Sequence, residues 1–410
     1  MRSREAGYIG FLWALLFGLV LLDSMISYLV VPRLPVPFPV NALLPIGMLL
    51  PLGFAGVSHA LPSQKVLVWL FLSFLGFSLG IAILPELPLL RYLKILSALC
   101  AFFIGYNAIK YAVNENAYIN VVLIVSFFYA VVCVSALLGV APGVFPLVKA
   151  YGFREGVEFF RPEITTDQNF QVFYLFPGLL ALAIPLNYLR GGLVFFIALA
   201  ALYSLAQLQT RSGIILLVIT LFLAYFYVAW IQRRSIAWQS LVVGLLFFVI
   251  FLVKQAAIVS LISDIQYRFF EDDFDTLWGR VHSATYLLEK VWNPLWWVPQ
   301  GNTEFMALSN GVKPHFSPTA FYLEGGLLSL LGWFALVLMP IVSLLKQSLA
   351  RRFDGFELAI VVGAVIACIG TLSLNAPLHE HLWLWMGAAQ GVYARRRLRM
   401  QRMQRMQRRK

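Results

Sequence analysis

Long apolar runs dominate this chain and limit what it can fold into. Of its 410 residues, 60% are hydrophobic and only 12% are charged, whereas soluble domains carry about 25% charged residues. A soluble globule of this size cannot bury so much apolar surface. The sequence therefore predicts an all-α, polytopic membrane protein, and it excludes a secreted or cytosolic enzyme and a protein that binds nucleic acid.

The apolar runs divide into separate membrane spans. A helix needs about 20 apolar residues to cross a bilayer, and this criterion predicts about 12 transmembrane helices within residues 1–394. They lie near residues 8–31, 38–57, 65–84, 92–112, 118–141, 171–189, 191–208, 213–231, 238–256, 319–345, 357–375 and 382–394. A tight turn at Arg190-Gly191-Gly192 is expected to separate the sixth span from the seventh.

The distribution of charge predicts how these spans are oriented. Cytoplasmic loops carry an excess of Lys and Arg, and here the basic residues and the carboxylates fall in alternate loops. Residues 395–410 contain nine basic residues and no acidic one, so both termini are expected to be cytoplasmic. Anionic lipid attracts such a tail, and its near-repeat of Arg-Met-Gln predicts a frayed, low-complexity arm.

The longest loop on the predicted outer side covers residues 257–318, between the ninth and tenth spans. Loops of this length are usually functional. The apolar spacing of residues 276–291 predicts a short helix at the membrane face. Trp292, Trp296 and Trp297 follow this helix, where tryptophans either anchor at the interface or stack on a sugar.

Histidine and arginine side chains on the outer side could carry chemistry. His315 lies between prolines just before the tenth span, and it either accepts a proton from a hydroxyl or hydrogen-bonds a loop carbonyl. Arg280 and Arg211 carry planar guanidinium groups that suit phosphate oxygens, although Arg211 could instead snorkel to the interface. Arg161 is a possible third cation, so these residues could hold a pyrophosphate beside an activated acceptor.

An acidic cluster lies earlier in the same loop, at residues 271–275. Its carboxylates could hold a divalent cation, but we interpret it as a solvated acidic rim. We assign no metal and no cofactor to the chain.

Several short motifs occur in one order and on one predicted membrane side. They are Asp167-Gln168-Asn169, Thr210-Arg211-Ser212-Gly213, Gly279-Arg280, Asn293-Pro294-Leu295, Gly301, His315 and Leu323-Glu324-Gly325-Gly326-Leu327. In these features the chain resembles the O-antigen ligase and O-antigen polymerase group of bacterial inner-membrane glycosyltransferases. It departs from the ligase pattern at Gln168, Phe316 and Ser329.

The resemblance implies transfer of a glycan from undecaprenyl pyrophosphate to an acceptor hydroxyl, by a metal-independent, inverting displacement in the Gram-negative inner membrane. The catalytic residues would be His315, Arg280 and Arg211, and the substrate-binding residues Arg161, Asn169, Trp296 and Trp297. In a ligase, which we favour, the acceptor is a sugar of lipid A-core. In a polymerase it is another lipid-linked repeat unit, and in a third branch a protein hydroxyl.

A non-enzymatic transporter of lipid-linked glycans is the competing class of protein. It would use the same outer arginines to bind pyrophosphate without reaction. Such a protein needs polar side chains along the middle of several spans, and the predicted span centres here are nearly free of charge.

Overall fold

The chain forms two compact units, each described here by itself. The computed structural model describes residues 3–22, 47–48, 61–84, 91–112, 114–140, 142, 144–145, 147–150, 159–162, 174–184, 187–208, 211–227, 275–308, 314, 316–345, 353–372 and 378–407. Residues 1–118, 279–352 and 360–410 make the first unit, and residues 119–278 and 353–359 make the second.

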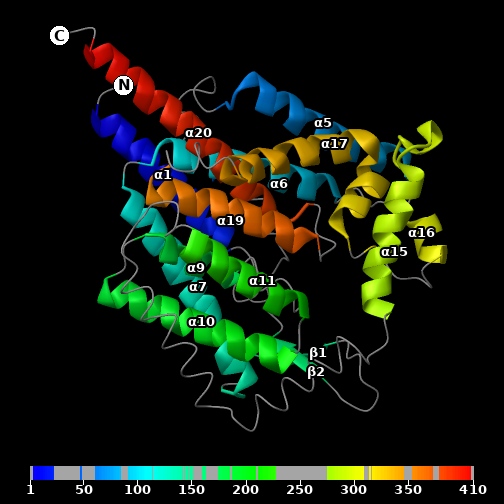
Figure 1. The fold of residues 1–410 in the computed structure, drawn as a ribbon, viewed down its shortest axis with the longest axis horizontal. Helices are drawn as coiled ribbons and strands as arrows, with labels where there is room; N and C mark the ends of the chain where they lie inside the picture. The colour runs from blue at the N-terminus through cyan, green and yellow to red at the C-terminus, as the bar shows by residue number, and fades with distance from the viewer. Residues whose placement is uncertain are drawn as a thin grey trace. The chain divides into compact units, whose positions relative to one another are not determined.

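The described fold is helical, as predicted (Figure 1). Its main helices are α1 (Ser3–Leu21), α5 (Gln64–Ile83), α6 (Arg91–Lys110), α7 (Glu115–Leu137), α10 (Tyr188–Leu208), α11 (Arg211–Leu221), α15 (Asp275–Lys290), α17 (Ser317–Leu345), α19 (Gly355–Thr371) and α20 (Glu380–Gln407). Among the described residues, five helices are long and apolar enough to cross a membrane: α5, α6, α7, α10 and α17. This indicates a membrane protein. The predicted span near 238–256 lies outside the described residues, as does that near 38–57 except for residues 47–48.

Helices α5 and α17 pack closely and run in opposite directions in the first unit (Figure 1). Gly80 faces the carbonyl of Glu324, where an added Cβ would lie 1.8 Å from the oxygen. At the other end of the contact, Gly332 faces Ser73. Between apolar helices, small residues allow such close approach, and the Ser329 hydroxyl donates to the Ser73 carbonyl at 2.9 Å.

Helices α6 and α20 make the second close pair of this unit, and they run in the same direction (Figure 1). Gly387 faces the carbonyl of Phe102, and Gly391 faces that of Tyr106. In the predicted topology α5 and α17 are the third and tenth spans, which should run in opposite directions. Helices α6 and α20 are the fourth and twelfth, which should run in the same direction. The observed directions agree with both expectations.

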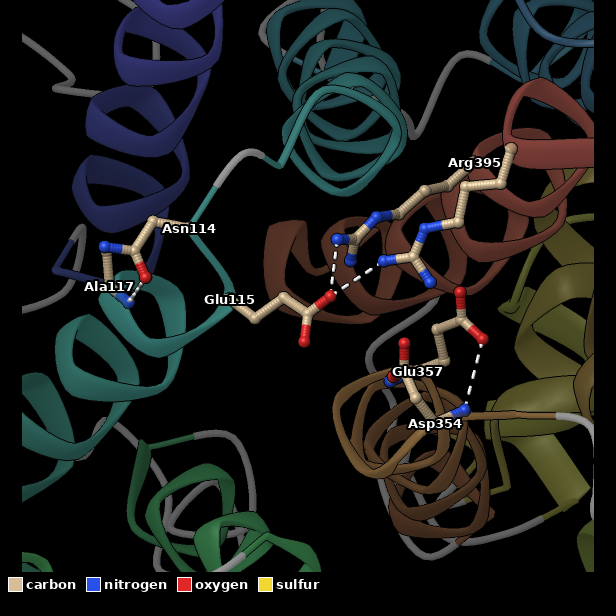
Figure 2. Close-up of polar contacts among 7 residues, drawn as sticks. Asn114, Glu115, Ala117, Asp354, Glu357 and Arg395 are labelled. Carbon is tan, nitrogen blue, oxygen red and sulfur yellow. Dashed lines mark hydrogen bonds and ion pairs between the residues drawn. The ribbon is translucent and has the colours of Figure 1, made fainter. Parts of the chain in front are cut away.

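The basic tail is helical as far as Gln407, which corrects the expectation of a frayed arm. Helix α20 continues without interruption from its buried apolar part to Gln407. Figure 2 shows the Glu115 carboxylate beside the Arg395 guanidinium, at 2.6 Å, and Arg399 lies 2.8 Å from the same oxygen. Arg, Met, Gln and Leu are strong helix formers, so a packed helix with two anchoring ion pairs extends into the tail.

The predicted span near 171–189 is not one continuous helix. Its described part is a short helix, α9 (Phe176–Leu179), followed by a 3₁₀ turn, η5 (Leu180–Ala183), and all eight residues are buried. Ile184 is then extended, with φ −120° and ψ 163°. Pro185 follows in the sequence, and a residue before proline is restricted to extended backbone, so the apolar run does not continue as a helix.

Helix α10 begins earlier than predicted, so Arg190-Gly191-Gly192 lies inside its first turns instead of in a turn between helices. The Asn187 side chain accepts a hydrogen bond from the Arg190 backbone N–H at 2.9 Å. This is the bond that an N-terminal cap makes. It fixes the helix start ahead of the two glycines.

The second unit also contains a pair of strands and the first residues of α19. Strands β1 (Leu147–Ala150) and β2 (Phe159–Pro162) form an antiparallel pair within a predicted outer loop, with Arg161 opposite Val148. Helix α19 begins with a capping box. In it, the Asp354 side chain accepts from the Glu357 N–H at 2.8 Å, and the Glu357 carboxylate accepts from the Asp354 N–H at 3.3 Å (Figure 2).

Candidate functional site

Helix α17 is broken at Gly326, in its N-terminal half. This residue has φ 67° and ψ −170°, a combination that only glycine adopts readily. The N–H of Leu327 would donate to the Leu323 carbonyl in an unbroken helix. The break leaves both backbone groups in need of partners, and buried backbone groups are costly when unpaired.

The segment Trp297–Gly301 supplies those partners. The Trp297 carbonyl accepts from the Leu327 N–H at 2.9 Å, and the Leu323 carbonyl accepts from the N–H groups of Gln300, at 3.1 Å, and Gly301, at 2.9 Å. Backbone hydrogen bonds thereby hold this segment of the predicted outer loop in the break of α17. It joins two motifs of the sequence analysis, Gly301 and Leu323–Leu327.

An ion pair lies in the same broken turn. Arg91, the first residue of α6, pairs with Glu324 of α17. The side chain of Glu324 is 5% exposed and that of Arg91 is 23% exposed. Ionisable residues in apolar helices are rarely unpaired. Arg91 is not among the predicted site residues. The signals that could have identified the pair were the predicted outer position of Arg91 and the presence of an acidic residue, Glu324, inside an apolar span.

Helix α15 confirms the predicted loop helix, and it is tied to the start of α17. The Thr319 hydroxyl donates to the Ser283 carbonyl at 2.6 Å, and the Tyr322 hydroxyl donates to the Lys290 carbonyl at 3.1 Å. Thr319 lies in the first turn of α17, which begins at Ser317, two residues after His315. In the sequence, His315 therefore comes just before the start of α17, which α15 holds in place.

Trp296 and Trp297 lie in this region with different contacts. The Lys290 ammonium lies 4.0 Å from the centre of the Trp296 ring and 3.1 Å from a carboxylate oxygen of Glu304. The Trp297 indole N–H donates to the Val291 carbonyl at 3.0 Å, and its side chain is 48% exposed. Trp296 thus carries a cation on its ring, and Trp297 presents an exposed aromatic surface beside the break.

For three of the other candidate residues the structure describes the position of the backbone only, and two lie outside the described residues. Arg280 is in α15 in the first unit, whereas Arg211 begins α11 and Arg161 is in β2 in the second unit. His315 and Asn169 lie outside the described residues. In the described part of the chain, no three His, Cys, Asp or Glu side chains gather as metal ligands.

His379, which precedes α20, has a pKa held well below its usual value of 6.5, because the ring is buried and because His381 and Lys94 add positive charge. Its Nδ1 accepts from the His381 backbone N–H at 3.3 Å, as a neutral ring can. The folded protein therefore disfavours the protonated form. Above about pH 6.5 His379 is neutral in both the folded and the unfolded chain, and its ionisation does not lower the free energy of unfolding. As the pH falls below that value the unfolded chain binds the proton and the buried ring does not, so the free energy of unfolding decreases.

We expect the thermal midpoint of the purified protein to decrease between about pH 6.5 and pH 5, and His379→Gln to reduce that decrease. The measurement is a melting curve at several pH values in one detergent. Identical pH profiles for the variant and the parent protein would contradict the assignment of the effect to His379.

A comparison with protein-family models and with curated proteins finds no match to this chain.

Proposed function

We propose that this protein is a glycosyltransferase that moves a glycan from undecaprenyl pyrophosphate to a sugar hydroxyl of lipid A-core, as an O-antigen ligase does. One observation carries the proposal. Two motifs of the resemblance, Gly301 and Leu323–Leu327, meet at hydrogen-bond distance in the break of α17. They join the loop that holds Arg280 and Trp296 to the helix that follows His315.

The proposed chemistry needs charge stabilisation and one base. The His315 imidazole takes the proton from the acceptor hydroxyl, and the oxygen attacks the anomeric carbon of the donor sugar. The bond from that carbon to the pyrophosphate oxygen breaks, and its electron pair leaves with the pyrophosphate. Arg280 and Arg211 stabilise the departing charge, and Arg161 and Asn169 help to bind it. General base catalysis of this kind contributes typically 10²–10⁴-fold.

The proposed location is the inner membrane of a Gram-negative bacterium, with the site on the periplasmic side and both termini in the cytoplasm. Two ion pairs support the predicted alternation of loops between two sides of the membrane. Arg91 and Glu324 both fall on the predicted outer side, and Glu115 and Arg395 both fall on the predicted inner side, and each pair is in contact. The lipid-linked donor then reaches the site from the bilayer.

Deletion of the gene in its host tests the function. Lipopolysaccharide is separated on a silver-stained gel beside an extract of undecaprenyl-linked glycans. A ligase leaves bare core on lipid A while long polymer accumulates on undecaprenyl pyrophosphate. A core capped by a single repeat unit would assign a polymerase instead, and an unchanged ladder would rule out both O-antigen activities.

Substitutions at the proposed catalytic residues sharpen this test. In the deletion strain, we expect His315→Ala and Arg280→Ala to accumulate normally in the membrane and to restore no transfer. Arg211→Lys is also expected to fail, because lysine cannot reproduce a bidentate contact with phosphate oxygens. The readout is the ladder together with the amount of protein. Full activity in any one variant would remove that residue from the mechanism.

A further inference from the structure

Two buried polar atoms on one face of α15 have no hydrogen-bond partner in the described structure. They are the hydroxyl oxygen of Tyr286 and Nε2 of His282. These residues are four apart, so their side chains are neighbours on the helix. Tyr286 is only 3% exposed. Nearly all buried polar groups in folded proteins are paired, and an exception calls for an explanation.

Aromatic rings pack against these two side chains. The ring of Phe305, from α16 (Thr303–Leu308), lies 5.3 Å from that of Tyr286 and 5.7 Å from that of His282. The Trp296 ring lies edge-on to Tyr286 at 6.3 Å. Helices α15 and α16 lie side by side in Figure 1. The setting combines flat apolar rings with two unused hydrogen-bonding groups.

We propose that His282 and Tyr286 form a hydroxyl-binding subsite for one sugar ring of the glycan, covered by α16 until the ligand binds. The proposal rests on the proposed function for its class of ligand. The Tyr286 hydroxyl donates to a sugar oxygen, and His282 Nε2 forms a hydrogen bond with a second hydroxyl of the sugar. The C–H face of the sugar packs on the aromatic rings, as apolar faces do on Phe and Trp.

The charges around this subsite favour a neutral sugar over the pyrophosphate. The ammonium of Lys290, 5.5 Å from the centre of the Tyr286 ring, is already paired with Glu304, and that carboxylate would repel an anion. Burial first, and then the negative charge of Glu304, raise the pKa of Tyr286. The phenol therefore stays protonated and available as a donor.

Binding requires α16 to move, because Phe305 is 1% exposed and its ring packs on those of both His282 and Tyr286. The six-residue helix is tied to α15 by the Lys290–Glu304 ion pair, whose side chains are 28% and 45% exposed. Exposed pairs of this kind hold weakly. Glu304→Gln is therefore expected to speed glycan binding at least twofold; an unchanged or slower association would overturn the covering role of α16.

The subsite is tested with Tyr286→Phe, which removes one oxygen. The probe is the free glycan released by mild acid from the undecaprenyl-linked pool of the host, added to the full-length protein in lipid nanodiscs. Binding is followed by tryptophan fluorescence. We expect the variant to bind about 5- to 10-fold more weakly, the loss typical of one hydrogen bond, and to melt at the same or a higher temperature, because an unpaired buried hydroxyl destabilises the fold.

Tyr118→Phe is the matched control. Its hydroxyl donates to the Gly10 carbonyl at 3.2 Å, so this variant should melt at a lower temperature and bind the glycan normally. Glycan affinity unchanged in Tyr286→Phe, or no glycan binding by the parent protein, would overturn the subsite. The subsite would also be overturned if Tyr286→Phe bound inorganic pyrophosphate, used as a second probe, more weakly while its glycan binding stayed intact. Because binding is measured directly, an unchanged lipopolysaccharide ladder after gene deletion would overturn the proposed transfer reaction without overturning the subsite.

Discussion

Gly326→Ala is expected to abolish transfer and to lower the stability of the folded protein substantially. A residue with a side chain costs about 1–3 kcal/mol in this region of backbone space. In addition, its Cβ would lie 2.6 Å from the Trp297 carbonyl oxygen. That oxygen cannot move away freely because it accepts the hydrogen bond of Leu327. The substitution therefore displaces the loop segment from the break in α17.

The measurement is the melting temperature in detergent together with restoration of the lipopolysaccharide ladder in the deletion strain. Gly192→Ala is the matched control, because Gly192 lies in α10 and an added Cβ there meets no atom within 4 Å. Alanine favours a helix by about 0.5–1 kcal/mol over glycine, so this control should melt no earlier than the parent protein. A Gly326→Ala protein that melts and functions like the parent would show that the break does not hold the loop.

Arg91→Met is expected to have the second large effect. It leaves the Glu324 carboxylate, with a side chain only 5% exposed, without its counterion in an apolar surrounding. Removing one partner of a buried pair costs about 3–5 kcal/mol. Glu324→Gln should cost less, because the Arg91 side chain is 23% exposed and can turn toward water. Both single variants are expected to lose glycan transfer, because the Arg91–Glu324 ion pair lies in the broken turn of α17.

The double variant Arg91→Met with Glu324→Met separates charge from packing. Replacing both members of a buried pair by apolar residues of similar volume is often neutral, so its melting temperature should return most of the way to that of the parent. Arg399→Gln serves as the control for loss of an exposed cation. Its side chain is 44% exposed and Glu115 retains Arg395, so we expect a change below about 1 kcal/mol. Equal destabilisation by Arg399→Gln and Arg91→Met would contradict the buried pair.

The predicted elements that proved correct are those set by local pattern. The loop helix expected at residues 276–291 is α15, Asp275–Lys290, because its apolar residues recur at helical spacing. The expected span at 171–189 failed because an apolar pattern does not register the effect of Pro185, which lies within the run and follows the extended Ile184. The break at Gly326 escaped prediction for a related reason. The apolar pattern runs straight through it, and the broken backbone is stable only with the carbonyl and N–H groups of Trp297–Gly301 in place.

The sequence by itself determined that this is a helical membrane protein, because the transfer of each apolar run out of water depends on that run alone. It also determined on which side each loop is expected, since charge placement is local. Only the tertiary structure decided which charges meet. Arg91 and Glu324 are 233 residues apart, and Arg395 and Glu115 are 280 apart. Such contacts depend on how glycine-bearing helices pack, and that packing is a property of the folded chain as a whole.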